Sequence, residues 1–156
     1  SLRGVVDRQV DAFDPDAIGR QSDVVFCALP HAASAEAVGA LRERGQTVLD
    51  LSADFRFEDL AVYESWYGKH PVPERLPEAV YGLVELHREE LRDADLIAVP
   101  GCYPTASTLA LAPLIENGLI RTDGIAVVAM RVVSGAGRGL SNATHFPVSA
   151  EGVRAY

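Results

Sequence analysis

The chain has 156 residues, of which 48% are hydrophobic and 23% charged, and its formal net charge is -8. This composition is typical of an ordinary soluble globular protein. The negative charge argues against nucleic-acid binding. The sequence has no lysine and arginine cluster and no apolar run near the roughly 20 residues of a membrane span, which argues against a membrane partner.

The two cysteines, Cys27 and Cys102, are too few for a disulfide framework, so a reducing, cytoplasmic location is expected. Neither has a histidine at metal-ligand spacing, and no metal site is predicted. Cys27 lies inside an apolar run, where we expect a buried and unreactive thiol.

The first part of the chain reads as a β-α-β unit. Residues 23–29 are apolar throughout, which predicts a buried parallel strand. Ser34 is then predicted to cap a helix over residues 35–44, which Gly45 ends. Residues 47–51 form the second predicted strand. A right-handed crossover between these strands implies a parallel sheet.

Strands and helices continue to alternate further along the chain. Residues 54–77 are mostly irregular, with a short helix predicted at 60–67, and residues 83–91 are predicted to be helical. A strand at 96–99 and a further helix follow. These elements predict an α/β protein with a doubly wound (Rossmann-type) parallel sheet.

The C-terminal part begins with a helix predicted at 104–117, followed by a strand at 125–133. No glycine-rich dinucleotide motif precedes residue 23, and the chain stops soon after a new strand begins. The doubly wound sheet is therefore expected to be incomplete, and the chain to be an internal piece of a longer protein.

Cys102 is the most informative residue of the sequence. An apolar strand ends at Pro100 and Gly101, the cysteine follows, and a helix-forming segment begins at once. A thiol there lies at the positive end of a helix dipole, which favours the nucleophilic thiolate. The nearby backbone N–H groups could hold an oxyanion. We therefore predict that Cys102 is a catalytic nucleophile.

Polar residues follow the first two predicted strands, at the sheet edge where ligands bind in such folds. Leu29, Pro30 and His31 end the first strand and are candidate cofactor contacts, and a turn residue at the rim is the alternative for His31. Ser52 and Arg56 follow the second strand. Arg56 could hold a substrate carboxylate or phosphate, or could form a structural salt bridge.

A second candidate loop spans residues 134–139 and contains three glycines in six residues. The glycines suit either a tight turn or a close approach of backbone to a ligand. Arg138 could pair with phosphate or be solvated. His145 is an alternative base within the chain, although a packing role is favoured. Three aromatic residues at helical spacing predict a packed face, namely Tyr63, Trp66 and Tyr67.

Several segments together resemble N-acetyl-gamma-glutamyl-phosphate reductases, the NADP-dependent enzymes of arginine biosynthesis. The stretch from Ile97 to Pro113 is similar to the active-site signature of that family. The other similar segments occur in family order over nearly the whole chain: Ala28 to His31, Asp50 to Arg56, Tyr81 to Leu86, Val133 to Arg138, and His145 with Phe146.

The resemblance implies a C-terminal portion of an NADP-binding domain over residues 1–101 and the start of an α/β catalytic and dimerisation domain over 102–156. It implies a homo-oligomer that takes an acyl phosphate and releases phosphate. N-acetyl-L-glutamyl 5-phosphate would react with Cys102 to give a thioester, which NADPH reduces to the 5-semialdehyde. The implied cofactor contacts are Leu29, Pro30, His31, Ser52, Ser134, Gly135, Ala136 and Gly137, and the implied substrate contacts are Arg56 and Arg138.

The sequence also departs from the family pattern. The glycine-rich fingerprint would lie before Ser1, and the histidine partner of the cysteine would lie soon after Tyr156, so the 156-residue piece alone is expected to be inactive. Two relatives remain alternatives, an aspartate-semialdehyde dehydrogenase-like enzyme and an amino-adipyl-phosphate reductase. A non-catalytic interaction module is the contrasting alternative.

Overall fold

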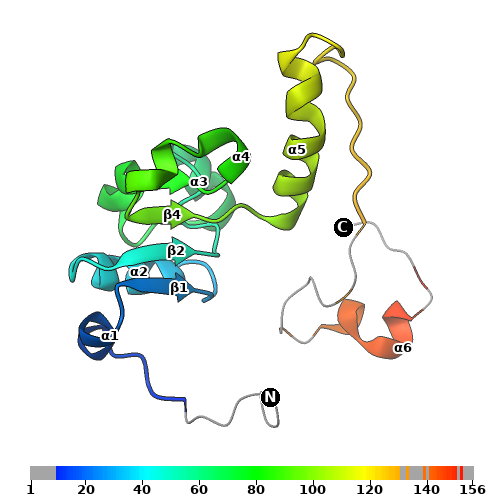
Figure 1. Cartoon of the computed structure of the whole chain (residues 1–156). Helices are drawn as coiled ribbons and strands as arrows, with labels where there is room; N and C mark the ends of the chain where they lie inside the picture. The colour runs from blue at the N-terminus through cyan, green and yellow to red at the C-terminus, as the bar shows by residue number, and fades with distance from the viewer. Residues whose placement is uncertain (1–9, 131–132, 134–138, 140, 151, 153–156) are drawn as a thin grey trace. The chain divides into compact units, whose positions relative to one another are not determined.

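The computed structural model describes residues 10–130, 133, 139, 141–150 and 152 (Figure 1). The chain divides into two compact units, Ser1–Pro113 and Leu114–Tyr156, which are described separately below. No helix in these described residues is both long and apolar enough to cross a membrane. The same residues contain no group of three or more His, Cys, Asp or Glu side chains that could hold a metal ion.

The first unit is built on a four-stranded parallel sheet with the order β1-β2-β4-β3. Its strands are β1 (Val24–Cys27), β2 (Thr47–Asp50), β3 (Ala79–Tyr81) and β4 (Leu96–Ala98). One row of the register joins Cys27, Asp50, Ala98 and Tyr81. The prediction of an α/β fold with a parallel, Rossmann-type sheet is confirmed.

Helix α2 (Ala33–Arg42) covers one face of this sheet. Ala35, Val38 and Leu41 recur at a spacing of three residues, so they lie on one side of the helix, and all three are fully buried. They form one core cluster with the strand residues Val48 and Leu96. This packing fixes α2 against β1 and β2, with its N-terminus at the carboxyl edge of the sheet.

The opposite face of the sheet carries a continuous apolar row. Phe26 pairs with Leu49, Leu49 with Ile97, and Ile97 with Val80, so one apolar side chain from each strand lies on this row. Phe26 is 70% exposed, whereas the next residue, Cys27, points toward α2 and is 5% exposed.

Three elements of the first unit, namely α1 (Pro15–Gln21), the 3-10 helix η1 (Pro73–Glu78) and β3, were not predicted from the sequence. Helix α1 begins at the cap Asp14, whose carboxylate accepts hydrogen bonds from the N–H groups of Asp16 and Ala17. Strand β3 follows η1 directly and has only three residues.

The remaining elements of this unit agree largely with expectation. Helix α3 (Leu60–Tyr67) has the predicted bounds and is capped by the Asp59 carboxylate. In place of one helix over residues 83–91, the structure has α4 (Val84–His87) and the 3-10 helix η2 (Glu90–Asp93).

Helix α5 (Cys102–Glu116) begins two residues earlier than predicted, at the cysteine itself. In the second unit, the strand predicted at 125–133 is wrong over residues 125–130, which form no strand and are all exposed. An apolar run becomes a strand only where a neighbouring strand pairs with it. The unit also contains the 3-10 helix η4 (Asn142–Thr144) and the short helix α6 (Phe146–Ser149).

Candidate functional site

The carboxyl ends of β1, β2 and β4 continue as a short ladder of backbone hydrogen bonds. The N–H of Leu51 donates to the carbonyl of Cys27 at 2.8 Å, and the N–H of Val99 donates to that of Asp50 at 2.9 Å. The loops that follow these three strands therefore start side by side, at the edge where parallel α/β sheets bind ligands.

Asp50 closes the end of β2 with a fully buried carboxylate. Its two oxygens accept hydrogen bonds from the hydroxyl groups of Ser34 and Ser52, each at 2.5 Å. The prediction that Ser34 caps α2 is therefore wrong, because its hydroxyl donates to Asp50 and the N-cap position belongs to Ala32. Ser52 is 3% exposed. Its contact with a cofactor stays a prediction.

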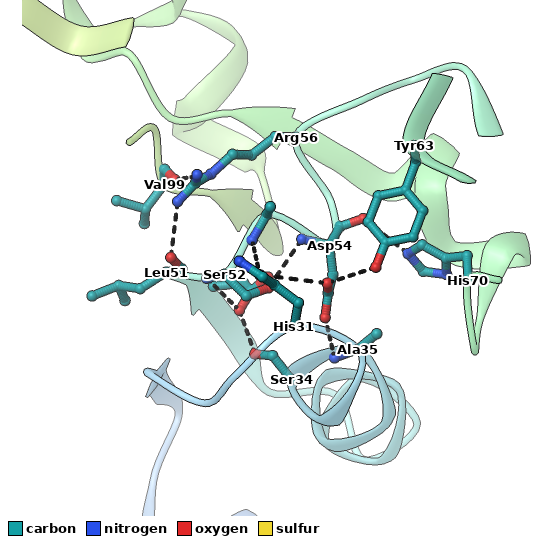
Figure 2. Close-up of polar contacts among 12 residues, drawn as sticks. His31, Ser34, Ala35, Leu51, Ser52, Asp54, Arg56, Tyr63, His70 and Val99 are labelled. Atoms are coloured by element: carbon teal, nitrogen blue, oxygen red, sulfur yellow. Dashed lines mark hydrogen bonds and ion pairs between the residues drawn. The ribbon is translucent and has the colours of Figure 1, made fainter. Parts of the chain in front are cut away.

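Asp54 caps α2 from a different part of the chain (Figure 2). Its Oδ2 accepts from the N–H of Ala35 at 2.9 Å, and its Oδ1 accepts from the hydroxyl of Tyr63 at 2.8 Å. The positive end of the α2 dipole stabilises this fully buried charge. Burial, together with the hydrogen bond to Asp54, raises the pKa of Tyr63 well above its usual value.

His31 lies next to this carboxylate with its ring held at one nitrogen. Its Nδ1 accepts a hydrogen bond from the N–H of Ala53 at 3.0 Å, so in the neutral ring the proton is on Nε2. The ring also packs edge-on against Tyr67, with ring centroids 4.9 Å apart. Because the side chain is 52% exposed, His31 offers a hydrogen-bond donor at the edge of the sheet.

The backbone turn after His31 is strained. Ala32 has a φ of 65° and a ψ of -50°, and the N–H of Ala33 donates to the carbonyl of His31 at 2.9 Å. This geometry is close to that of a classic γ-turn, which is rare for residues other than glycine.

Arg56 bridges the ends of two neighbouring strands, as Figure 2 shows. Its Nε donates to the carbonyl of Val99 at 2.8 Å, and its Nη2 donates to the carbonyl of Leu51 at 2.9 Å. These partners are backbone carbonyls rather than the carboxylate of a salt bridge. Substrate binding by Arg56 stays a prediction, for which Nη1 is the remaining nitrogen.

Cys102 is exposed and is the first residue of α5, directly after the turn that ends β4 (Figure 1). The carbonyl of Gly101 accepts the first helical hydrogen bond, from the N–H of Thr105 at 3.0 Å. The N–H of Cys102 therefore has no acceptor within the helix. Cys27, in contrast, is buried, and burial, followed by the negative charge of Asp50, raises the pKa of its thiol to about 11.

Several other candidates are placed elsewhere or lie outside the described residues. The candidate residues that lie outside the described part of the chain are Ser134, Gly135, Ala136, Gly137 and Arg138. His145 is the exposed N-cap residue of α6. The predicted packed aromatic face holds only in part, because Tyr63 is buried and stacks on Tyr67 whereas Trp66 is 78% exposed.

Sequence reasoning missed the structural role of His70. This side chain is 1% exposed, its Nε2 donates to the carbonyl of Asp54 at 2.8 Å, and its Nδ1 accepts from the N–H of Val72 at 3.1 Å. His70 therefore holds the backbone of the loop that carries Asp54. The alternating polar residues Asp50, Ser52 and Asp54, which begin at the end of a buried strand, were the available signal for this network.

Comparisons with known proteins identify the family of the chain. The family model described as "Semialdehyde dehydrogenase, NAD binding domain" matches residues 1–94, and "Semialdehyde dehydrogenase, dimerisation domain" matches residues 102–156.

Similar curated proteins carry the name N-acetyl-gamma-glutamyl-phosphate reductase. One from Desulforudis audaxviator is 51% identical over 99% of this chain and 45% of its own length. One from Methanopyrus kandleri is 54% identical over 92% of this chain and 41% of its own length. The chain thus spans less than half the length of these relatives. The resemblance predicted from the sequence is confirmed, and the chain belongs to the semialdehyde dehydrogenase family.

Proposed function

We propose that the chain is part of an NADP-dependent N-acetyl-gamma-glutamyl-phosphate reductase of arginine biosynthesis. This enzyme would convert N-acetyl-L-glutamyl 5-phosphate to the 5-semialdehyde with release of phosphate. The observation that carries the proposal is the exposed thiol of Cys102 at the start of α5, directly after the turn that follows β4. The names of the relatives support the choice of substrate.

Cys102 would act as the nucleophile. Its Sγ forms a bond to the acyl carbon, and the bond from that carbon to the phosphate oxygen breaks, with the electron pair leaving on phosphate. The product on the protein is a thioester. The positive end of α5 and the N–H of Cys102 are suited to stabilise the oxyanion formed during this attack. NADPH, when bound, supplies the hydride that brings the acyl group to the aldehyde level.

The carboxyl edge of the sheet offers exposed apolar side chains and a hydrogen-bond donor, both of which suit one end of a dinucleotide. Leu29 and Leu51 are 43% and 45% exposed there, and such apolar side chains suit the faces of a ring. His31 offers its Nε2–H to an oxygen acceptor. We propose that Leu29, Pro30 and His31 contact the cofactor. Ser52, the loop of Ser134, Gly135, Ala136 and Gly137, and the substrate contacts Arg56 and Arg138 belong to the same proposal.

The domain organisation is proposed on the same basis. Residues 1–101 would be the C-terminal portion of the NADP-binding domain, and residues 102–156 the start of the catalytic and dimerisation domain. The matched dimerisation domain supports a homo-oligomer. The proposed location is the cytoplasm.

Turnover assays of the complete protein test this proposal. We expect oxidation of N-acetyl-glutamate 5-semialdehyde, in the presence of NADP and phosphate, to be faster than oxidation of aspartate or aminoadipate semialdehyde. Replacing the nucleophile in Cys102→Ser should lower this activity by about 10³-fold or more. Full activity of Cys102→Ala would contradict the proposal. A complete protein that turns over none of the three substrates would favour a non-catalytic module.

A further inference from the structure

We propose that Arg56 is a positioning residue for Cys102, because it holds the backbone turn between β4 and α5. The inference rests on the proposed function, in which Cys102 is the nucleophile. Arg56 follows β2, whereas Cys102 follows β4, and these two strands are neighbours in the sheet. A side chain from one strand end can therefore reach the turn that leaves the other.

The hydrogen bonds of Arg56 hold the turn at Val99, three residues before Cys102. The carbonyl of Val99 accepts from Nε of Arg56 at 2.8 Å, and the N–H of Val99 donates to the carbonyl of Asp50 at 2.9 Å. Both backbone polar groups of Val99 are therefore bound to the segment formed by the end of β2 and the loop that follows it. The second bond of Arg56, from Nη2 to the carbonyl of Leu51 at 2.9 Å, ties the guanidinium itself to that segment.

The third nitrogen of the guanidinium lies against Gly101. A Cβ atom placed on Gly101 would be 3.2 Å from Nη1 of Arg56, which is tighter than most such contacts in proteins, so the guanidinium would have to shift slightly. The φ of Gly101 lies outside the left-handed region, so an added methyl group would act through this contact rather than through backbone strain. The carbonyl of the same residue accepts the first hydrogen bond of α5. Arg56 thus packs on the residue from which the helix begins.

This arrangement depends on the shape of the guanidinium rather than on its charge alone. The planar fork of arginine presents several N–H donors in fixed directions, whereas lysine presents one compact ammonium group on a flexible stem. A lysine at position 56 would keep the positive charge but would not bridge the carbonyls of Leu51 and Val99 in the same way. The substitution Arg56→Lys therefore separates positioning from electrostatic substrate binding.

The test compares Arg56→Lys with the matched control Arg92→Lys in the complete protein. Arg92 bonds only to Glu89 on the surface among the residues described, and its replacement should change nothing. For Arg56→Lys, kcat per thiol of Cys102 titrated with iodoacetamide should fall by about 10²-fold, as expected for a misplacement near 1 Å. The KM for the acyl phosphate should stay within about twofold. Amide hydrogen exchange over residues 99–103 should become faster without any ligand.

Other results of these measurements would overturn the positioning role of Arg56 or the proposed function. An unchanged kcat, or unchanged hydrogen exchange over the turn, would overturn the positioning role. A raised KM with an unchanged kcat would overturn the positioning role and leave Arg56 as a substrate contact alone. If the wild-type protein turns over no acyl phosphate, the proposed function fails, and hydrogen exchange alone decides whether Arg56 holds the turn.

A second variant covers the case in which Arg56→Lys does not fold. Gly101→Ala leaves Arg56 in place but puts a methyl group against Nη1, so we expect a loss of kcat in the same direction. The two substitutions should be less than additive when combined, because they disturb one contact. Wild-type kinetics in Gly101→Ala would overturn the proposal.

Discussion

The carboxylate of Asp54 accepts a hydrogen bond from the N–H of Ala35 and thereby caps a helix to which Asp54 does not belong. Helices α1 and α3 are capped locally, by Asp14 and Asp59. Helix α2 has Ala32 at its N-cap, with no side chain able to accept a hydrogen bond. The loop after β2 supplies the missing acceptor, and this joins the ends of α2 and β2 at the candidate site.

Replacing Asp54 should therefore cost more stability than replacing a surface cap. In Asp54→Ala, the buried N–H of Ala35 and the hydroxyl of Tyr63 both lose their acceptor, and we expect the free energy of unfolding to fall by about 2–4 kcal/mol. Urea unfolding of the purified protein measures this change. The matched substitution Asp59→Ala, at an exposed cap, should cost about 1 kcal/mol. Equal losses for the two variants would contradict the role assigned to Asp54.

The strained turn at Ala32 predicts a stabilising substitution. Glycine adopts a positive φ at little steric cost, so Ala32→Gly should raise the free energy of unfolding by about 1 kcal/mol despite the greater flexibility of its unfolded chain. Thermal unfolding gives the sign directly. The neighbouring variant Ala33→Gly places glycine in the first turn of α2 and should be destabilising. A lower melting temperature for Ala32→Gly than for the wild type would show that the turn is not strained.

The buried thiol of Cys27 should make the stability of the protein depend on pH. Because burial raises the pKa of Cys27 from 9.0 to about 11, the folded state keeps this proton at pH values where the unfolded state has lost it. Its contribution to stability is therefore complete below about pH 9 and is lost as the pH rises toward 11, by about 2 kcal/mol. Subtracting the pH profile of Cys27→Ala from that of the wild type isolates this loss. Parallel profiles between pH 8 and pH 11 would contradict the raised pKa.

The tautomer of His31 predicts a donor role toward the cofactor. Removing the Nε2–H in His31→Ala should weaken NADPH binding about fivefold, the effect of one ordinary hydrogen bond. Fluorescence titration of the complete protein gives the dissociation constant. Nitrogen NMR of the ligand-free protein shows independently which ring nitrogen carries the proton. The control His87→Ala, whose side chain lies near Glu90 in the first unit, should bind NADPH as the wild type does.

The sequence predicted those parts of the fold that depend on local patterns. The strands at 24–27, 47–50 and 96–98 stood out because their apolar runs are bounded by turn residues. Strand β3 was missed, since three residues after a 3-10 helix carry too short a pattern. The strand predicted at 125–133 was wrong over 125–130, because hydrophobicity alone does not provide a pairing partner.

The candidate site likewise has one part that local sequence patterns predicted and another that they did not. The place of Cys102 at the start of a helix follows from the residues on either side of it, and the structure has the helix begin there. The capping of α2 by Asp54 joins residues 19 positions apart, and the bridge from Arg56 to Val99 joins residues 43 apart. Such contacts exist only after the strands have paired, so no local sequence pattern predicts them.

Asp50 and Asp54 also have a joint consequence, because they bond to consecutive residues, Ser34 and Ala35. The loops that carry His31 and Arg56 are therefore locked to one another through the start of α2. If the dinucleotide binds at this edge, as we propose, it would meet loops that are already held in place, and little conformational entropy would be lost on binding.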